Sequence, residues 1–111
     1  MNVDAVGHHN KHNKNFLIDR PDGAGDWLLL LTQSRAVFRI QGSEVRVPAG
    51  YFILFTPDEP EYYYADEEIY CDDWLHFWAF EEDLALMESL QIPMNTLVEA
   101  GNSALLSADR K

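Results

Sequence analysis

The sequence predicts a mainly β fold, a small β-barrel or β-sandwich followed by one C-terminal helix. Short apolar and aromatic runs alternate with Gly/Pro turn clusters between residues 16 and 80, which is the spacing of six or seven short strands. A helical apolar period appears after residue 80. The chain has 111 residues, 47% of them apolar, which suffices for one buried core but not for two.

The elements follow one another in three regions. Residues 1–14 are mostly polar, so we expect an N-terminal arm without regular structure. Residues 15–80 are expected to form the β-barrel. Its candidate strands are rich in β-branched, aromatic and aliphatic side chains; they are the runs FLID, WLLLLT, RAVFRI, EVRV, YFILFT, EYYYA and YCDDWLHFWAF.

Two local patterns predict how neighbouring strands connect. Side chains alternate along residues 37–40 and 44–47, on either side of a tight connection at residues 41–43, which predicts a hairpin with one solvated face. The segment Pro48-Ala49-Gly50 follows. It is expected to turn the chain, because proline cannot donate a ladder hydrogen bond and glycine readily takes a positive φ.

The helix is predicted by charge and by period. Three acidic residues follow Phe80, and negative charge suits the positive N-terminal end of a helix. Phe80, Leu84 and Met87 recur at i, i+4 and i+7, so one amphipathic helix is expected to run to about Leu90. Residues 81–111 are therefore a C-terminal helix and a tail, and the sequence leaves the structure of the tail open.

The charge excludes one class of partner. The formal net charge is −11, and no Lys or Arg lies between residues 47 and 109. Nucleic-acid affinity depends on cations that contact phosphates, so we expect that this chain alone binds no nucleic acid. The acidic surface is most simply a solvated one, and docking of a basic partner is the alternative.

The single cysteine and the polar N-terminus indicate a compartment. Cys71 has no partner for an internal disulfide, which favours a reducing environment. The chain shows neither a signal-peptide pattern nor an apolar run long enough to cross a bilayer. We therefore expect a cytoplasmic location and no membrane partner.

Several chemistries lack their residues. Three of the four histidines, His8, His9 and His12, lie in the polar arm, so no metal site is expected. No serine lies in a G-x-S-x-G context, and Cys71 adjoins two aspartates that oppose a thiolate. Phosphate-binding glycine loops are also missing. We therefore expect neither a catalytic residue nor a cofactor.

The last predicted strand carries a polar and aromatic face. Asp72, Trp74 and His76 share it, because side chains alternate along a strand. If this face lines the barrel, Asp72 accepts hydrogen bonds from hydroxyls and Trp74 stacks on an apolar ring face. Solvent exposure of this face is the alternative. For His76, a packed and hydrogen-bonded histidine is favoured over a ligand contact.

The order and spacing of five motifs indicate a family. Together they resemble the N-terminal cupin-like effector-binding domain of AraC-family transcription regulators, over about residues 6–93. The motifs are Ile18-Asp19-Arg20-Pro21-x-Gly23, Asp26-Trp27-Leu28-Leu29-Leu30, Pro48-Ala49-Gly50, Phe55-Thr56-Pro57 and Trp74-Leu75-His76-Phe77.

The resemblance implies a fold and an assembly. It implies a cupin-like barrel, a double-stranded β-helix or jelly roll, that holds a small effector. In that family the barrel passes its occupancy to a helix-turn-helix DNA-binding domain, which we expect to lie outside this chain. Dimerisation in the family uses helices that follow the barrel, so a homodimer is implied here.

The resemblance also implies ligand contacts. The sugar-binding arginine of the family's arabinose sensor falls on Arg20, the stacking tryptophan on Trp74 and a binding tyrosine on Tyr63. Asp72 stands where that sensor has a binding histidine, which suggests a different effector. Glu61 stands where many members have a histidine. The arm around His8 and His9 is implied to fold over the effector.

The leading hypothesis is therefore a non-catalytic effector-sensing domain for a sugar or another small polar molecule. Arg20 would donate to ligand oxygens, Asp72 would accept from hydroxyls, Trp74 would stack and Tyr63 would close the pocket. Two alternatives remain open. One is a small metal-dependent cupin enzyme that acts on a sugar or related metabolite, and the other is an acidic protein-interaction module.

Overall fold

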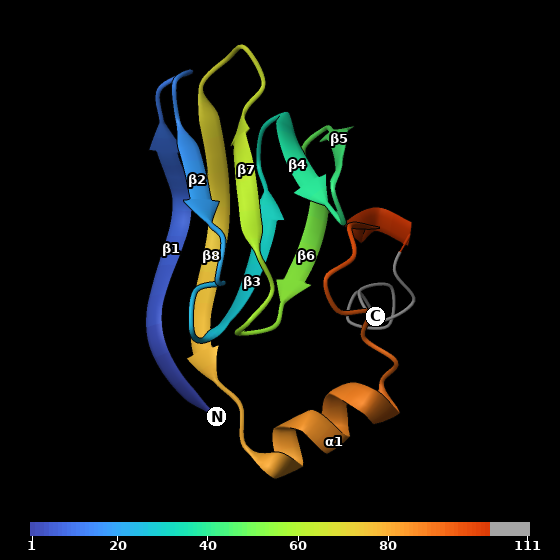
Figure 1. The fold of residues 1–111 in the computed structure, drawn as a ribbon. Coiled ribbons are helices and arrows are strands. Elements are labelled where there is room, and N and C mark those ends of the chain that lie inside the picture. Colours follow the sequence, from blue (N-terminus) through green and yellow to red (C-terminus); the bar gives the residue numbers. More distant parts are fainter. Residues whose placement is uncertain (103–111) are drawn as a thin grey trace.

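The computed structural model describes residues 1–102 and has the mainly β class that the sequence predicts (Figure 1). Nine strands, one α-helix and one short 3₁₀ helix follow each other along this part of the chain. In order they are β1 (Asn2–His12), β2 (Leu17–Arg20), β3 (Trp27–Thr32), β4 (Ala36–Ile40), β5 (Ser43–Val47), β6 (Tyr51–Phe55), β7 (Glu61–Ala65), β8 (Tyr70–Trp78), α1 (Glu81–Ser89), β9 (Val98–Glu99) and η1 (Ala100–Asn102).

The strands form two antiparallel sheets. One has the order β1-β8-β3-β6-β9 and the other the order β2-β7-β4-β5. They lie face to face in Figure 1, and apolar side chains of both sheets form the core between them. The buried core residues are Leu28, Leu30, Ala36, Phe38, Val47, Ile53, Phe55, Tyr63, Ala65 and Tyr70.

The predicted connections are confirmed. β4 and β5 form a hairpin whose two loop residues, Gln41 and Gly42, have φ angles of 50° and 82°. Two positive φ angles characterise the turn whose twist matches that of the flanking strands. Gly50 has a φ of 93° and donates its N–H to the carbonyl of Thr32 at 2.8 Å. The turn before β6 therefore depends on a glycine.

The N-terminus differs from the prediction. Residues 2–12 form β1, a strand of eleven residues, whereas the sequence predicts an arm without regular structure. β1 pairs antiparallel with β8, with Asn2 opposite Trp78 and His12 opposite Tyr70. It is an edge strand, and polar residues suit an edge because much of its surface faces water. Its β structure depends on backbone pairing rather than on an apolar pattern.

The predicted helix is present, but its apolar face is not buried. α1 begins after Phe80, whose N–H donates to Asp83 Oδ2 at 2.8 Å, and it ends before Gln91, which has a φ of 56°. No residue of α1 is buried, and Leu86 is 58% exposed. The helix lies below one end of the sheets in Figure 1.

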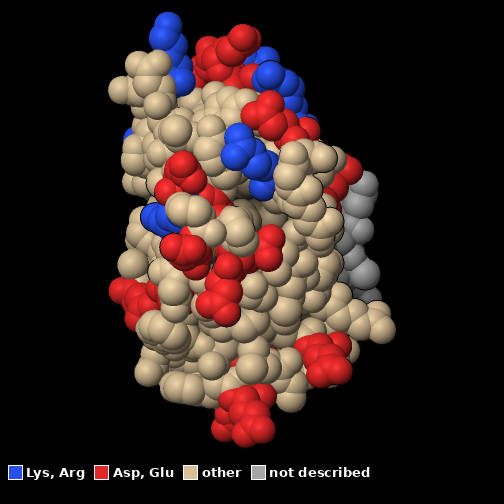
Figure 2. Space-filling model, viewed as in Figure 1, with Lys and Arg blue, Asp and Glu red and all other residues tan. Residues whose placement is uncertain are grey.

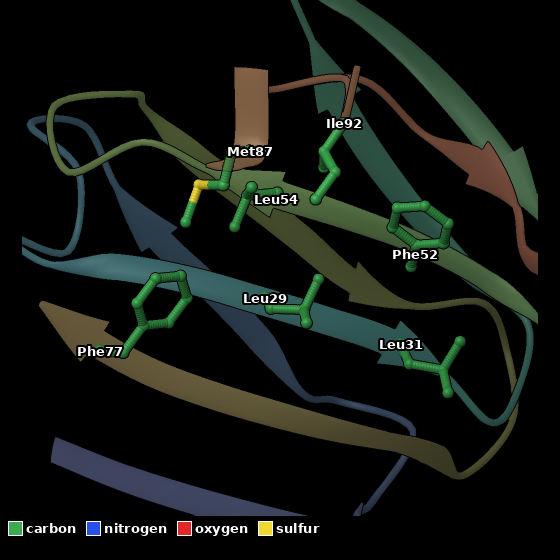
Figure 3. A pocket seen from close by; sticks show the side chains of 7 residues that line it. All are labelled: Leu29, Leu31, Phe52, Leu54, Phe77, Met87 and Ile92. Carbon is green, nitrogen blue, oxygen red and sulfur yellow. The ribbon is translucent and has the colours of Figure 1, made fainter. Parts of the chain in front are cut away.

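The outer face of the five-stranded sheet carries an apolar groove of about 260 Å³ (Figure 3). β3 has apolar side chains on both faces: Leu28 and Leu30 point into the core, whereas Leu29 and Leu31 line this groove. The other lining residues are Phe52, Leu54, Phe77, Met87 and Ile92. Met87 is the contribution of α1.

Acidic side chains are the charged groups seen on part of the surface. In Figure 2 the lower part of the viewed face shows Asp and Glu, with Lys and Arg only above it.

The first part of the tail forms β9 and η1, and β9 pairs with β6. Residues 103–111, which complete the predicted tail, lie outside the described residues. No helix in residues 1–102 has the length and apolar content to cross a membrane.

Candidate functional site

A cavity of about 210 Å³ brings together all four predicted ligand contacts. Arg20 enters from β2, Tyr63 from β7, and Asp72 and Trp74 from β8. Further residues of β1, of the β1–β2 connection, of β2, of β3 and of β8 complete the wall. These other lining residues are Asn10, His12, Phe16, Ile18, Leu28 and His76.

The polar and aromatic face of β8 points into this cavity. Asp72, Trp74 and His76 line it, as the alternation along the strand predicts. Asp72 is only 2% exposed, so the alternative of a solvent-facing strand is wrong at this position. Trp78, at the end of the same face, is 48% exposed and does not line the cavity.

Asp72 supplies an acceptor without a donor. Its Oδ2 accepts a hydrogen bond from the Tyr70 hydroxyl at 2.6 Å, but its buried Oδ1 has no partner among the described residues. Burial raises the pKa of Asp72 from 3.8 to about 6, against the opposing effects of the Tyr70 hydrogen bond and of His12. Buried polar atoms in native proteins nearly always have partners. A ligand hydroxyl or ammonium group would supply one here.

Arg20 is held by a glutamate that the sequence analysis did not count as a contact. Arg20 Nη1 donates to Glu61 Oε1 at 2.8 Å, and Glu61 is completely buried. Burial raises the pKa of Glu61, although the bond to Arg20 favours its ionised form. Glu61 Oε2 has no partner among the described residues. Glu61 thus orients the guanidinium of Arg20 at the cavity wall.

Trp74 lies over a glycine. Gly7 of β1 is opposite Trp74 of β8, and a Cβ at residue 7 would lie 2.3 Å from the indole Cε2. Real Cβ atoms do not lie so close to another non-bonded heavy atom. The absence of a side chain at Gly7 therefore defines the position of the indole. The indole also meets the His76 ring edge to face, with centroids 5.4 Å apart.

This contact predicts the effect of a single methyl group. We expect Gly7→Ala to displace the indole, to shift the tryptophan emission spectrum and to lower the free energy of unfolding by about 1–3 kcal/mol. Gly101→Ala is the matched control, because a Cβ there meets no atom of the described residues within 4 Å. Fluorescence and chemical denaturation measure both effects. An unchanged emission spectrum in Gly7→Ala would contradict this placement of the indole.

Tyr63 and His76 have structural partners as well. Tyr63 is 4% exposed and stacks on Phe38, with centroids 5.1 Å apart. Burial raises the pKa of Tyr63, so its hydroxyl stays protonated. His76 Nδ1 lies 2.8 Å from Asp26 Oδ1. His76 is therefore the hydrogen-bonded histidine that the sequence analysis favours, although its ring also reaches the cavity wall.

The sequence analysis missed the contribution of β1. His12 stacks on Phe16 with centroids 4.1 Å apart, and its Nε2 lies 2.9 Å from Asn10 Nδ2. Asn10, Lys11 and His12 are all polar, so the sequence shows no alternation of apolar and polar residues that would identify a strand here. His8 and His9, which the resemblance places over the effector, do not line the cavity. They lie beside Asp73 on the outer face of the sheet.

Comparisons with known proteins agree with this architecture. The sequence matches no model of a known protein family and no curated protein. The structure is similar to the Cupin_2 domain of an XRE-family transcriptional regulator from Enterobacter cloacae, with a TM-score of 0.52 and 16% identity. The match covers 63% of this chain and 77% of that domain. The chain therefore has a cupin-like fold.

Proposed function

We propose that this chain is a non-catalytic effector-sensing domain of a transcription regulator, and that its cavity binds a small polyhydroxylated molecule, most simply a carbohydrate. The observation that carries the proposal is the unpartnered Oδ1 of Asp72, which shares one cavity with the Trp74 indole and the Arg20 guanidinium. An acceptor and a donor fork can pair with the hydroxyls of a sugar, and an aromatic face can pack against the apolar face of its ring.

The size of the cavity supports a small ligand. Its volume of about 210 Å³ lies below the roughly 300–1,000 Å³ of pockets for drug-sized molecules. The polar groups are few and fixed: Tyr70 holds Asp72, and Glu61 holds Arg20. Fixed polar groups favour selective binding, because a ligand that fails to pair them leaves buried groups unsatisfied. No paired nucleophile and base is needed for this role.

The regulatory part of the proposal has two supports. The similar Cupin_2 domain belongs to a transcriptional regulator. The motifs around Arg20 and Trp74 resemble the AraC family in particular. We propose that the chain senses its effector in a cytoplasmic regulator of that type, as a homodimer. DNA contact would use another domain, because the net charge of −11 opposes phosphate binding by this one.

Isothermal titration calorimetry with pentoses, hexoses, amino sugars and uronic acids tests the proposed site. We expect at least one neutral or amine-bearing sugar to bind, and Trp74→Ala to lower its affinity at least about tenfold, which is 1.4 kcal/mol. Trp78→Ala is the matched control, because that indole lies on the same strand outside the cavity. Equal losses in both variants, or none in Trp74→Ala, would contradict the assignment.

The same titration distinguishes the sensor from the two alternative functions, an acidic interaction module and a cupin enzyme. An acidic interaction module would ignore sugars and would bind a basic partner with an affinity that falls steeply with salt. The distribution of acidic residues on the lower part of the face in Figure 2 suits such a partner. A cupin enzyme would convert the bound sugar. Sugar binding that is independent of salt and leaves the sugar unchanged supports the sensor.

A further inference from the structure

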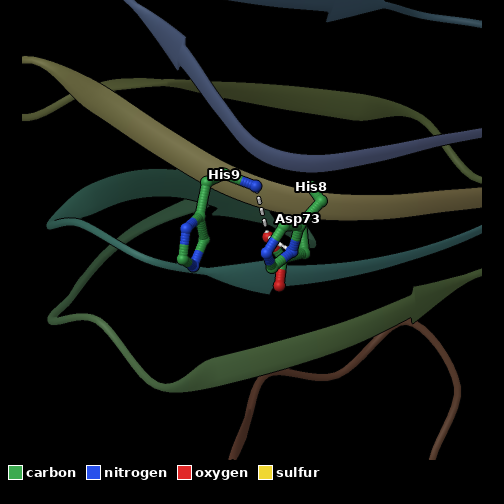
Figure 4. A group of neighbouring side chains, drawn as sticks. All are labelled: His8, His9 and Asp73. Atoms are coloured by element: carbon green, nitrogen blue, oxygen red, sulfur yellow. Dashed lines mark hydrogen bonds and ion pairs between the residues drawn. The ribbon is translucent and has the colours of Figure 1, made fainter.

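A β-bulge gathers three potential metal ligands on the outer face of the five-stranded sheet. The β1–β8 register shifts between Gly7, opposite Trp74, and Asn10, opposite Asp72, so that His8 and His9 together face Asp73. His9 has a φ of 46°. Adjacent residues of a regular strand point to opposite faces. The bulge instead places both imidazoles beside the same carboxylate (Figure 4).

The side chains are close and the carboxylate is fixed. His8 Nδ1 lies 3.2 Å from Asp73 Oδ1, and one ligand atom from each of the three residues lies within 4.8 Å of the others. The backbone N–H of His9 donates to Asp73 Oδ1 at 2.6 Å, and the side-chain amide of Gln33 donates from Nε2 to Asp73 Oδ2 at 3.0 Å. Orientation of a ligating carboxylate by neighbouring donors is a regular feature of metal sites.

We propose that His8, His9 and Asp73 bind one divalent transition-metal ion, for which Zn²⁺ is the best match. Two imidazoles and one carboxylate suit Zn²⁺ and its neighbours, whereas Mg²⁺ and Ca²⁺ require mostly oxygen ligands. His8 and His9 are exposed, so water can complete the coordination. Zn–N bonds of about 2.0–2.1 Å would require the two exposed rings to turn toward the ion.

This proposed site is separate from the cavity, and it differs from the expectation drawn from the sequence. The sequence analysis placed three of the four histidines in a polar arm, away from other ligands. The pairing of β1 with β8 instead brings His8 and His9 to Asp73. The metal would join the edge strand to its neighbour. Because β1 also supplies Asn10 and His12 to the cavity wall, the ion would hold that wall in place. The ligand set exists only in the folded chain, so Zn²⁺ is expected to stabilise it.

Calorimetric titration of the full chain without an affinity tag, with Zn²⁺ alone, tests the site. We expect one Zn²⁺ per chain and a higher melting temperature with the ion. His8→Ala, His9→Ala and Asp73→Asn should each lower the affinity at least about tenfold, whereas Asp58→Asn, at an exposed aspartate elsewhere, should not change it. Both histidines are exposed, so their variants keep the fold and report binding directly.

Gln33→Ala tests the positioning role of Gln33. Loss of an orienting partner lowers metal affinity by about 10–100-fold, and the melting temperature without metal should stay near that of the native chain. Three results would overturn the proposal: no Zn²⁺ binding by the native chain, equal binding by His8→Ala and His9→Ala, or equal loss of binding in Asp58→Asn. None of them bears on sugar binding in the cavity.

Discussion

Replacement of Arg20 by alanine is expected to lower the free energy of unfolding by about 3–5 kcal/mol. Glu61 is completely buried and its hydrogen-bond partner is Arg20 Nη1, so the substitution leaves a carboxylate in the core without a cation. Loss of one member of a buried ion pair costs far more than the pair contributes, because the remaining charge keeps its desolvation cost. Urea denaturation of both proteins measures the difference.

The pH dependence identifies the cause. Burial already raises the pKa of Glu61, and removal of Arg20 should raise it further. A group with a raised pKa in the folded state stabilises the fold at low pH, and this contribution is lost as the pH rises through that pKa. The cost of Arg20→Ala should therefore be larger at pH 8 than at pH 5. Glu61→Gln in the Arg20→Ala background should restore most of the stability.

A matched surface variant isolates burial from charge. Arg35 pairs with Glu68 at 3.2 Å, but both side chains are about half exposed. Arg35→Ala should cost less than about 1 kcal/mol, with little dependence on pH. If Arg20→Ala costs no more than Arg35→Ala, Glu61 has another partner and the assigned role of this pair in the cavity fails.

Asp72→Asn is expected to raise the free energy of unfolding at pH 7.5 by roughly 3 kcal/mol. The pKa of Asp72 rises from 3.8 to about 6 because the carboxyl is buried. Between these values the folded chain keeps a proton that the unfolded chain releases, so the native protein loses stability as the pH rises from about 4 to about 6. The amide that replaces the carboxyl carries no charge, so the variant should lack this loss.

Denaturation curves between pH 4 and pH 8 measure this effect. Asp58→Asn is the control, because Asp58 is exposed and should retain the native pH profile. Ligand binding should also depend on the charge of the Asp72 carboxylate. Above pH 6 an amine-bearing sugar should bind more tightly than the uronate of the same size, and Asp72→Asn should remove that preference. An unaltered pH profile in Asp72→Asn would show that Asp72 stays ionised and paired.

Local patterns in the sequence were sufficient to predict most of the barrel. The hairpin at Gln41-Gly42, the turn at Gly50 and the beginning of α1 at Phe80 all depend on residues within a few positions of one another. Alternation along β8 places Asp72 and Trp74 on one face, and the structure turns that face into the cavity, an outcome that the sequence left open. Local chemistry fixes the turns and the alternation, so sequence alone can reveal them.

The features that were missed depend on distant partners. β1 became a strand because β8 offers it backbone hydrogen bonds, and nothing within residues 2–12 announces that partner. Glu61 gained its role from Arg20, which is 41 residues away in the chain. The exposed helix α1 is a third case. An apolar period predicts a helix, but it does not tell how much of the helix packs against the rest of the protein.

The pairing of the first strand with the last long one also has a consequence for folding. β1 is synthesised before its partner β8, which ends at Trp78, so β1 stays unpaired for several seconds at the usual rates of about 5–20 residues per second. Such long-range pairing places folding in the slow, millisecond-to-second range. β1 is mostly polar, so we expect it not to aggregate while it is unpaired; the same polarity makes the strand hard to recognise from the sequence.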